Sequence, residues 1–77
     1  MKTKKNEIMK EENRKKIGSQ ILDIRMEQGW TQEQLGEMCG VKAVTIDKIE
    51  QGRFNVSLDV IGKVCDVLGV QMVLVEV

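Results

Sequence analysis

Few side chains in this 77-residue sequence could carry out chemistry. There are two cysteines, Cys39 and Cys65, and no histidine, so a tetrahedral zinc site has too few ligands. Both cysteines lie within apolar helical patterns, which favours small buried hydrophobic residues over a redox pair. The chain is also too short to enclose a substrate beside a nucleophile and a base. We therefore expect no enzyme activity, no metal and no cofactor.

Basic side chains are the second chemical feature, because they could bind an anion. The sequence has 12 lysine and arginine residues and 12 aspartate and glutamate residues, so the net charge alone gives no argument for an anionic partner. The distribution is uneven: residues 1–16 hold seven basic and three acidic side chains, a surplus of +4, and the remainder carries −4. Residues 1–12 are predicted to be a flexible basic arm, which either is simply solvated or tracks phosphates.

The elements that must position these groups are predicted to be helices. Ile17, Ile21 and Ile24 recur at helical spacing, which predicts a helix from about Asn13 to near Gly29. Arg25 lies at the edge of this apolar stripe, where an unpaired charge is costly to bury. It therefore needs an acidic partner.

A short helix follows, and its start has a strong signal. Thr31 and Gln34 have the spacing of a capping box, and Trp30 can pack on Leu35 as a hydrophobic staple. Gly40 follows Thr31 by nine residues and allows a tight turn before another helical segment. This segment places Ile46, Ile49 and Glu50 on one face. The opposite face, which should be exposed, carries Ala43, Val44, Asp47, Lys48 and Gln51.

The last part of the domain contains one more helix and a predicted strand. Gly52 ends the preceding helix, and Ser57 is a good N-cap for a helix from Leu58 to about Leu68. Residues 70–77 are rich in β-branched side chains and are predicted to form a strand. No other segment of the chain is predicted to be a strand that could pair with it. We expect it to pair with the same segment of a second chain, through Val70, Met72, Val73, Leu74 and Val75.

These elements make one domain, residues 13–69, between the arm and the strand. No stretch approaches the ~18 apolar residues of a membrane span, and the N-terminus lacks the apolar segment of a signal peptide. We therefore expect a cytoplasmic protein that does not contact a membrane.

Residues 17–68 resemble the Cro/phage-repressor type of helix-turn-helix, the XRE-like family of prokaryotic regulators. The resemblance rests on Ile17-Gly18, Arg25, the run from Trp30 to Gly36, Gly40-Val41, Thr45-Ile46, the run from Lys48 to Gly52, and residues 58–69. It implies an all-α, lambda-repressor-like DNA-binding domain of four to five helices, with the C-terminal strand pairing between protomers. The helix that follows the turn would enter the major groove of duplex DNA.

The resemblance also implies roles for individual residues. Gln32 would donate to a phosphate at a helix N-terminus, and Arg25 would form a semi-buried ion pair with Glu50. The phosphate-binding loop positions are Arg53 and Asn55. The groove-facing set is Lys42, Ala43, Val44, Asp47 and Lys48. Ala43 and Val44 replace the long polar residues that many family members use, so base contacts should be few.

The leading hypothesis is therefore a homodimeric, sequence-specific transcriptional repressor. The C-terminal strand looks like that of the antitoxin branch of the family, which adds a toxin protein as a possible partner. The alternative is a protein-interaction module on the same fold that does not bind DNA. Two observations favour it: residues 17–77 carry a net charge of −4, and the groove-facing set, called the reading face below, includes short apolar side chains.

Overall fold

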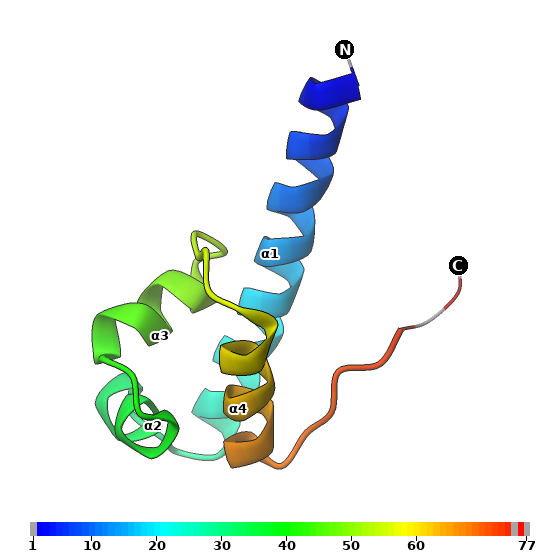
Figure 1. The fold of residues 1–77 in the computed structure, drawn as a ribbon. Coiled ribbons are helices and arrows are strands. Elements are labelled where there is room, and N and C mark those ends of the chain that lie inside the picture. The colour runs from blue at the N-terminus through cyan, green and yellow to red at the C-terminus, as the bar shows by residue number, and fades with distance from the viewer. Residues whose placement is uncertain (1, 75, 77) are drawn as a thin grey trace.

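The computed structural model of the protein describes residues 2–74 and 76, and the side chains of residues 11–74 and 76. Its helices are α1 (Lys2–Glu27), α2 (Gln32–Cys39), α3 (Ala43–Glu50) and α4 (Leu58–Leu68). α3 and α4 pack on the C-terminal half of α1, α2 packs on α3 and α4, and the N-terminal half of α1 projects beyond the other helices (Figure 1). No helix in the described ranges is both long and apolar enough to cross a membrane. The predicted all-α class is confirmed.

The core forms where all four helices meet. Leu35, Ile46, Ile49 and Val64 are completely buried side chains contributed by α2, α3 and α4. Around them lie Ile21, Ile61, Cys65 and Leu68. Burial raises the pKa of the Cys65 thiol, and it does the same for the half-buried Cys39. Cys65 thus lies in the core as its pattern predicted, and Cys39 packs against the core while staying half-buried.

The first helix is much longer than its apolar pattern indicated. The prediction that it begins near Asn13 is wrong, because α1 begins at Lys2. This stretch has no Gly or Pro and is rich in Lys and Glu, which are good helix formers. Glu11 precedes Lys15 by four residues, the stabilising order for such pairs. This stretch has no apolar stripe at helical spacing, so periodicity did not reveal it. The flexibility of residues 1–12 stays a prediction.

The last helix is capped as the sequence predicted, and it leads into the C-terminal segment. The Ser57 Oγ accepts from the N–H of Val60 at 3.3 Å. At the other end, Gly69 has φ +74°, and the N–H of Val70 donates to the carbonyl of Cys65 at 2.9 Å. Val70 is therefore part of the end of α4.

The strand predicted for residues 70–77 is not present in residues 70–74 or 76, which form neither helix nor strand. A strand needs a partner for its backbone groups, and a single chain supplies none. Val70 to Leu74 instead line a groove with Ile17, Ile21 and Ile24 of α1. Met72, Val73 and Leu74 are 46%, 71% and 102% exposed. Val75, also assigned to the dimer contact, lies outside the described residues, and the pairing stays a prediction.

The crossing of α1 and α3 depends on Gly18, and this gives a first prediction. A Cβ at Gly18 would overlap the carbonyl oxygen of Ile49 and lie 2.8 Å from that of Glu50. Both atoms are backbone and cannot rotate away. We expect Gly18→Ala to lose about 3 kcal/mol by overpacking. The better helix propensity of alanine returns about 1 kcal/mol. Urea unfolding should show a net loss of unfolding free energy.

Gly62 provides a matched control inside α4. No atom lies within 4 Å of a Cβ at this position, and its backbone is helical. Gly62→Ala should therefore raise the unfolding free energy by about 1 kcal/mol. Equal effects of the two substitutions would contradict the close approach of α1 to α3.

Candidate nucleic-acid interface

α2 and α3 form a rigid pair joined by a tight turn. The Thr31 Oγ1 accepts from the N–H of Gln34 at 3.0 Å, and the Gln34 Oε1 accepts from the N–H of Thr31 at 2.9 Å, which completes the capping box. Gly40 ends α2 with φ +74°. A Cβ at Gly36 would lie 2.7 Å from the carbonyl oxygen of Val41. Only glycine therefore fits where the turn between α2 and α3 packs back against α2. These contacts fix the angle at which α3 leaves α2.

One face of α3 is free of protein. Ile46, Ile49 and Glu50 are buried, as the helical pattern predicted. The residues assigned to the groove lie on the other side or at the start of the helix: Lys42, Val44 and Lys48 are exposed, and Ala43 and Asp47 are half-buried. The Lys42 side chain is exposed, and its ammonium group, which has donors only, cannot cap the free N–H groups at the start of α3. The exposed face therefore combines two lysines with a short apolar patch.

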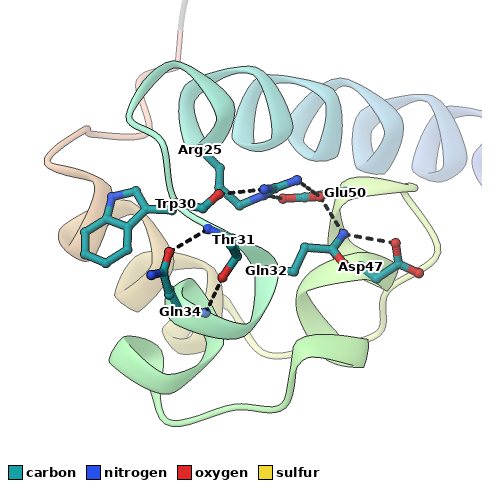
Figure 2. A network of polar contacts seen from close by, with 7 residues as sticks. All are labelled: Arg25, Trp30, Thr31, Gln32, Gln34, Asp47 and Glu50. Carbon is teal, nitrogen blue, oxygen red and sulfur yellow. Dashed lines mark hydrogen bonds and ion pairs between the residues drawn. The ribbon is translucent and has the colours of Figure 1, made fainter.

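An ion pair ties α1 to the inner side of α3. The Arg25 Nε lies 2.5 Å from the Glu50 Oε2, and Nη2 donates to Oε1 at 3.1 Å (Figure 2). Arg25 Nη1 also donates to the carbonyl of Trp30 at 2.7 Å. The two side chains are only 12% and 3% exposed. This is the partner that the position of Arg25 requires, and it fixes α3 against the helix behind it.

The Gln32 side chain is used within the protein, which differs from the role assigned to it. Its Nε2 donates to the Asp47 Oδ1 at 3.1 Å and to the Glu50 Oε1 at 2.9 Å (Figure 2). Both amide hydrogens are therefore committed to carboxylates of α3. The backbone N–H groups of Gln32 and Glu33, in the first turn of α2, have no intrahelical partner. They are the donors that this helix end offers to an anion.

Asp47 is held as a carboxylate on the exposed face. Its Oδ1 accepts from Gln32, and its Oδ2 accepts from the Nε2 of Gln51 at 2.7 Å. These two hydrogen bonds, with a smaller contribution from the charge of Arg53, lower the pKa of Asp47. The side chain is therefore ionised near neutral pH, as an acceptor must be. Gln51 belongs to the same polar row, although the site residues assigned from the sequence omit it.

Arg53 and Asn55 lie in the loop that follows α3, and both are exposed. The N–H of Arg53 donates to the carbonyl of Lys48 at 2.9 Å, so the loop begins directly from the last turn of α3. Gly52, with φ +73°, makes this change of direction. The loop is thus attached to the end of the exposed face.

One supporting contact was missed by sequence reasoning. The Gln28 Nε2 donates to the carbonyl of Leu68 at 2.7 Å, and the Gln28 Oε1 accepts from the Trp30 indole N–H at 3.0 Å. Gln28 therefore joins the end of α1 to the end of α4 and orients Trp30. No local pattern could reveal a contact between residues 40 apart in the sequence.

The same arrangement is found in known proteins. Residues 21–75 match a family described as Helix-turn-helix. The chain belongs to this helix-turn-helix family. The matched region contains α2, α3 and α4 with the second part of α1, so the unit recognised from the motifs is confirmed.

Two similar proteins support this assignment. A Neisseria meningitidis serogroup B protein named "Neisseria hypothetical transcription factor" is 37% identical over 47 residues, which cover 61% of this chain and 44% of that protein. The chain thus spans less than half the length of this relative. The restriction-modification controller protein C.AhdI from Aeromonas hydrophila has a crystal structure with a TM-score of 0.74 and 28% identity, covering 79% of this chain and 88% of C.AhdI. This helix-turn-helix chain therefore shares the all-α fold of C.AhdI.

Proposed function

We propose that this helix-turn-helix chain is a sequence-specific transcription regulator that binds duplex DNA by placing α3 in the major groove. The observation that carries the proposal is the exposed face of α3, held at a fixed angle beside the free N-terminus of α2. A major groove admits one α-helix, and this geometry presents the helix with its side chains outward. The names of the two similar proteins, a transcription factor and a restriction-modification controller, support the same function.

The charge distribution also supports this function, despite the −4 of residues 17–77. Five basic residues lie in this range, and Arg25 is used in the internal ion pair. Lys42, Lys48 and Arg53 lie on α3 or directly beside it, and Lys63 of α4 lies elsewhere. The exposed positive charge therefore gathers around the reading face, where phosphates flank the groove.

Each residue of the reading face has a chemical role in the proposal. Lys48 donates to guanine, and the ionised Asp47 accepts from the amino group of cytosine. Ala43 and Val44 contact thymine methyl groups. Gln32 acts indirectly, because its amide positions Asp47, while the backbone amides at the start of α2 bind a phosphate. Arg53 and Asn55 bind phosphates beyond the end of α3.

We further propose that the regulator is a homodimeric repressor. The exposed apolar side chains of Met72, Val73 and Leu74 support pairing of residues 70–77 between two copies. Two recognition helices would then lie roughly 34–36 Å apart and read a near-palindromic site. We do not propose an antitoxin role or a toxin partner, because neither of the two similar proteins named above is described as an antitoxin.

The alternative is a protein-interaction module that uses the same fold without binding DNA. The two functions differ in their response to salt. A DNA-binding protein with several phosphate contacts loses affinity steeply and log-linearly as salt rises, and a module shows no such binding. Fluorescence anisotropy with labelled duplexes at increasing salt separates them.

The roles on the reading face are tested by selecting binding sites from random duplexes. Lys48→Ala should relax the preference at one base position by about 1–3 kcal/mol, because it removes a direct base contact. Gln32→Ala should relax the preference at the position that Asp47 reads, because the Asp47 carboxylate loses the amide that positions it. Lys63→Ala, on the exposed side of α4, is the matched control and should bind like the parent. Equal losses on selected and random DNA for Lys48→Ala and Gln32→Ala would refute the base-reading roles of Lys48 and Asp47.

A further inference from the structure

A second basic surface lies where α1 passes the loop after α3, next to the exposed face of α3. An open hollow of ≈ 610 Å³ is formed there between the two segments. It is lined by Glu11, Arg14, Lys15, Gly52, Arg53, Phe54 and Asn55. Arg53 and Asn55 already belong to the proposed DNA interface, whereas Arg14 and Lys15 come from the part of α1 that precedes the family match.

The two segments are held together by close packing. A Cβ at Gly52 would lie 2.8 Å from the Cα of Lys15 and 2.9 Å from its backbone nitrogen. The turn after α3 therefore lies directly on the backbone of α1. The Arg14 guanidinium carbon lies 6.0 Å from the centre of the Phe54 ring, within the range of a cation–π contact. Arg14 and Lys15 are thus presented at a fixed place beside the loop.

The charge of the hollow suits an anion. Arg14, Lys15 and Arg53 contribute three cations, and Glu11 is its acidic residue. Within residues 11–74, no ion pair joins any of these three cations to a carboxylate. The backbone N–H of Arg53 donates to the carbonyl of Lys48 at 2.9 Å, so the hollow adjoins the end of α3. An anion bound here would lie next to DNA that occupies that face.

We infer that this hollow binds a DNA backbone phosphate flanking the groove that α3 enters, with Arg14 and Lys15 as additional phosphate ligands. The inference rests on the proposed function and extends the interface from the helix-turn-helix onto α1. A phosphate diester accepts hydrogen bonds from arginine, lysine and asparagine side chains, which are the groups gathered here. Such contacts add affinity for every sequence and do not change which bases are read.

Salt dependence measures these contacts directly. Each phosphate contact contributes about 0.9 to the slope of log affinity against log salt. Over a range of ~50 to ~200 mM salt, this slope corresponds to about 3–4-fold in affinity per contact. We expect the full-length chain with Arg14→Gln and Lys15→Gln together to lose up to about 1 from the slope, because one phosphate loses two of its cations, with an unchanged selected motif. Arg14→Lys should keep the slope, because it keeps the charge.

Two controls make the result specific. Lys63→Gln removes an exposed charge from α4 and should keep the parent slope. Thermal unfolding should show that each variant stays folded, because Arg14→Gln gives up only its cation–π contact with Phe54 and Lys15 packs against Gly52 largely through its backbone. A neutral methylphosphonate placed at single backbone positions should weaken the parent at one flanking position. The double variant should be less sensitive at that position, because only Arg53 and Asn55 of the hollow remain to bind the phosphate.

The outcomes separate the inference from the function on which it rests. A double variant with the parent slope overturns the inference and leaves binding through α3 intact. A parent chain that binds no duplex overturns the proposed function itself. Inorganic phosphate at matched ionic strength should compete no better than chloride. Stronger competition by phosphate in the parent than in the double variant would assign the hollow to a free anion instead, and that result would also overturn the inference.

Discussion

Arg25→Ala should lower the unfolding free energy by about 3–5 kcal/mol, the largest stability effect that we expect in this chain. The substitution leaves the Glu50 carboxylate, 3% exposed, without the cation that it contacts through two nitrogen atoms. It also frees the Trp30 carbonyl, which accepts from Arg25. A domain of this size gains only a few kcal/mol from its core, so the variant should be largely unfolded at 37 °C.

Urea unfolding at fixed protein concentration measures this loss, because self-association would add to the apparent stability. The matched variant is Arg25→Met with Glu50→Gln. It removes both charges and keeps an oxygen at residue 50 to accept from Gln32, whose amide lies 2.9 Å from the Glu50 Oε1. Replacing a buried ion pair by neutral groups is often close to neutral, so this double variant should regain most of the stability. Arg25→Ala with the stability of the parent would mean that the pair is solvated in solution.

Ending the chain after Val70 should abolish the dimer and weaken binding to a two-half-site operator on the order of 10²-fold or more. Val70 is kept because its N–H caps α4 through the Cys65 carbonyl. The loss removes Met72, Val73 and Leu74, whose apolar side chains are exposed in the single chain. Affinity for one isolated half-site should change little, because α3 is untouched.

Sedimentation velocity gives the oligomeric state of the truncated chain, and anisotropy with one and two half-sites gives the two affinities. Leu74→Asp in the full-length chain should reproduce the loss, since a charge at a paired apolar position is costly to bury. Gln71→Glu, an exposed polar position in the same segment, is the control and should stay dimeric. A truncated chain that sediments as a dimer would place the dimer contact elsewhere.

The parts of the fold that could be predicted from sequence are those with local signals. The capping box of Thr31 and Gln34, the turn at Gly40 and the buried side of α3 all depend on residues within one or two helical turns. The start of α1 was missed because Lys2 to Lys16 forms a helix without an apolar stripe. The helix signal in this stretch is local propensity, which the apolar periodicity does not report.

The parts of the site that could not be predicted depend on how the helices pack. Gln32 was assigned to a phosphate because of its place in α2, yet its amide reaches Asp47 and Glu50 across the α2 and α3 interface. The contacts of Gln28 with Leu68 and of Arg14 with Phe54 also join segments far apart in the sequence. Such pairs exist only once the relative positions of the helices are known.

The central claim, that the exposed face of α3 enters a groove of duplex DNA, is tested most directly by nuclear magnetic resonance. The ¹⁵N-labelled chain is titrated with the duplex recovered by selection, and amide shifts are followed residue by residue. We predict the largest shifts at Ala43, Val44 and Lys48 and in the first turn of α2, with weaker binding as salt rises. Shifts confined to α4 and residues 70–74, with α3 unchanged, would contradict the claim.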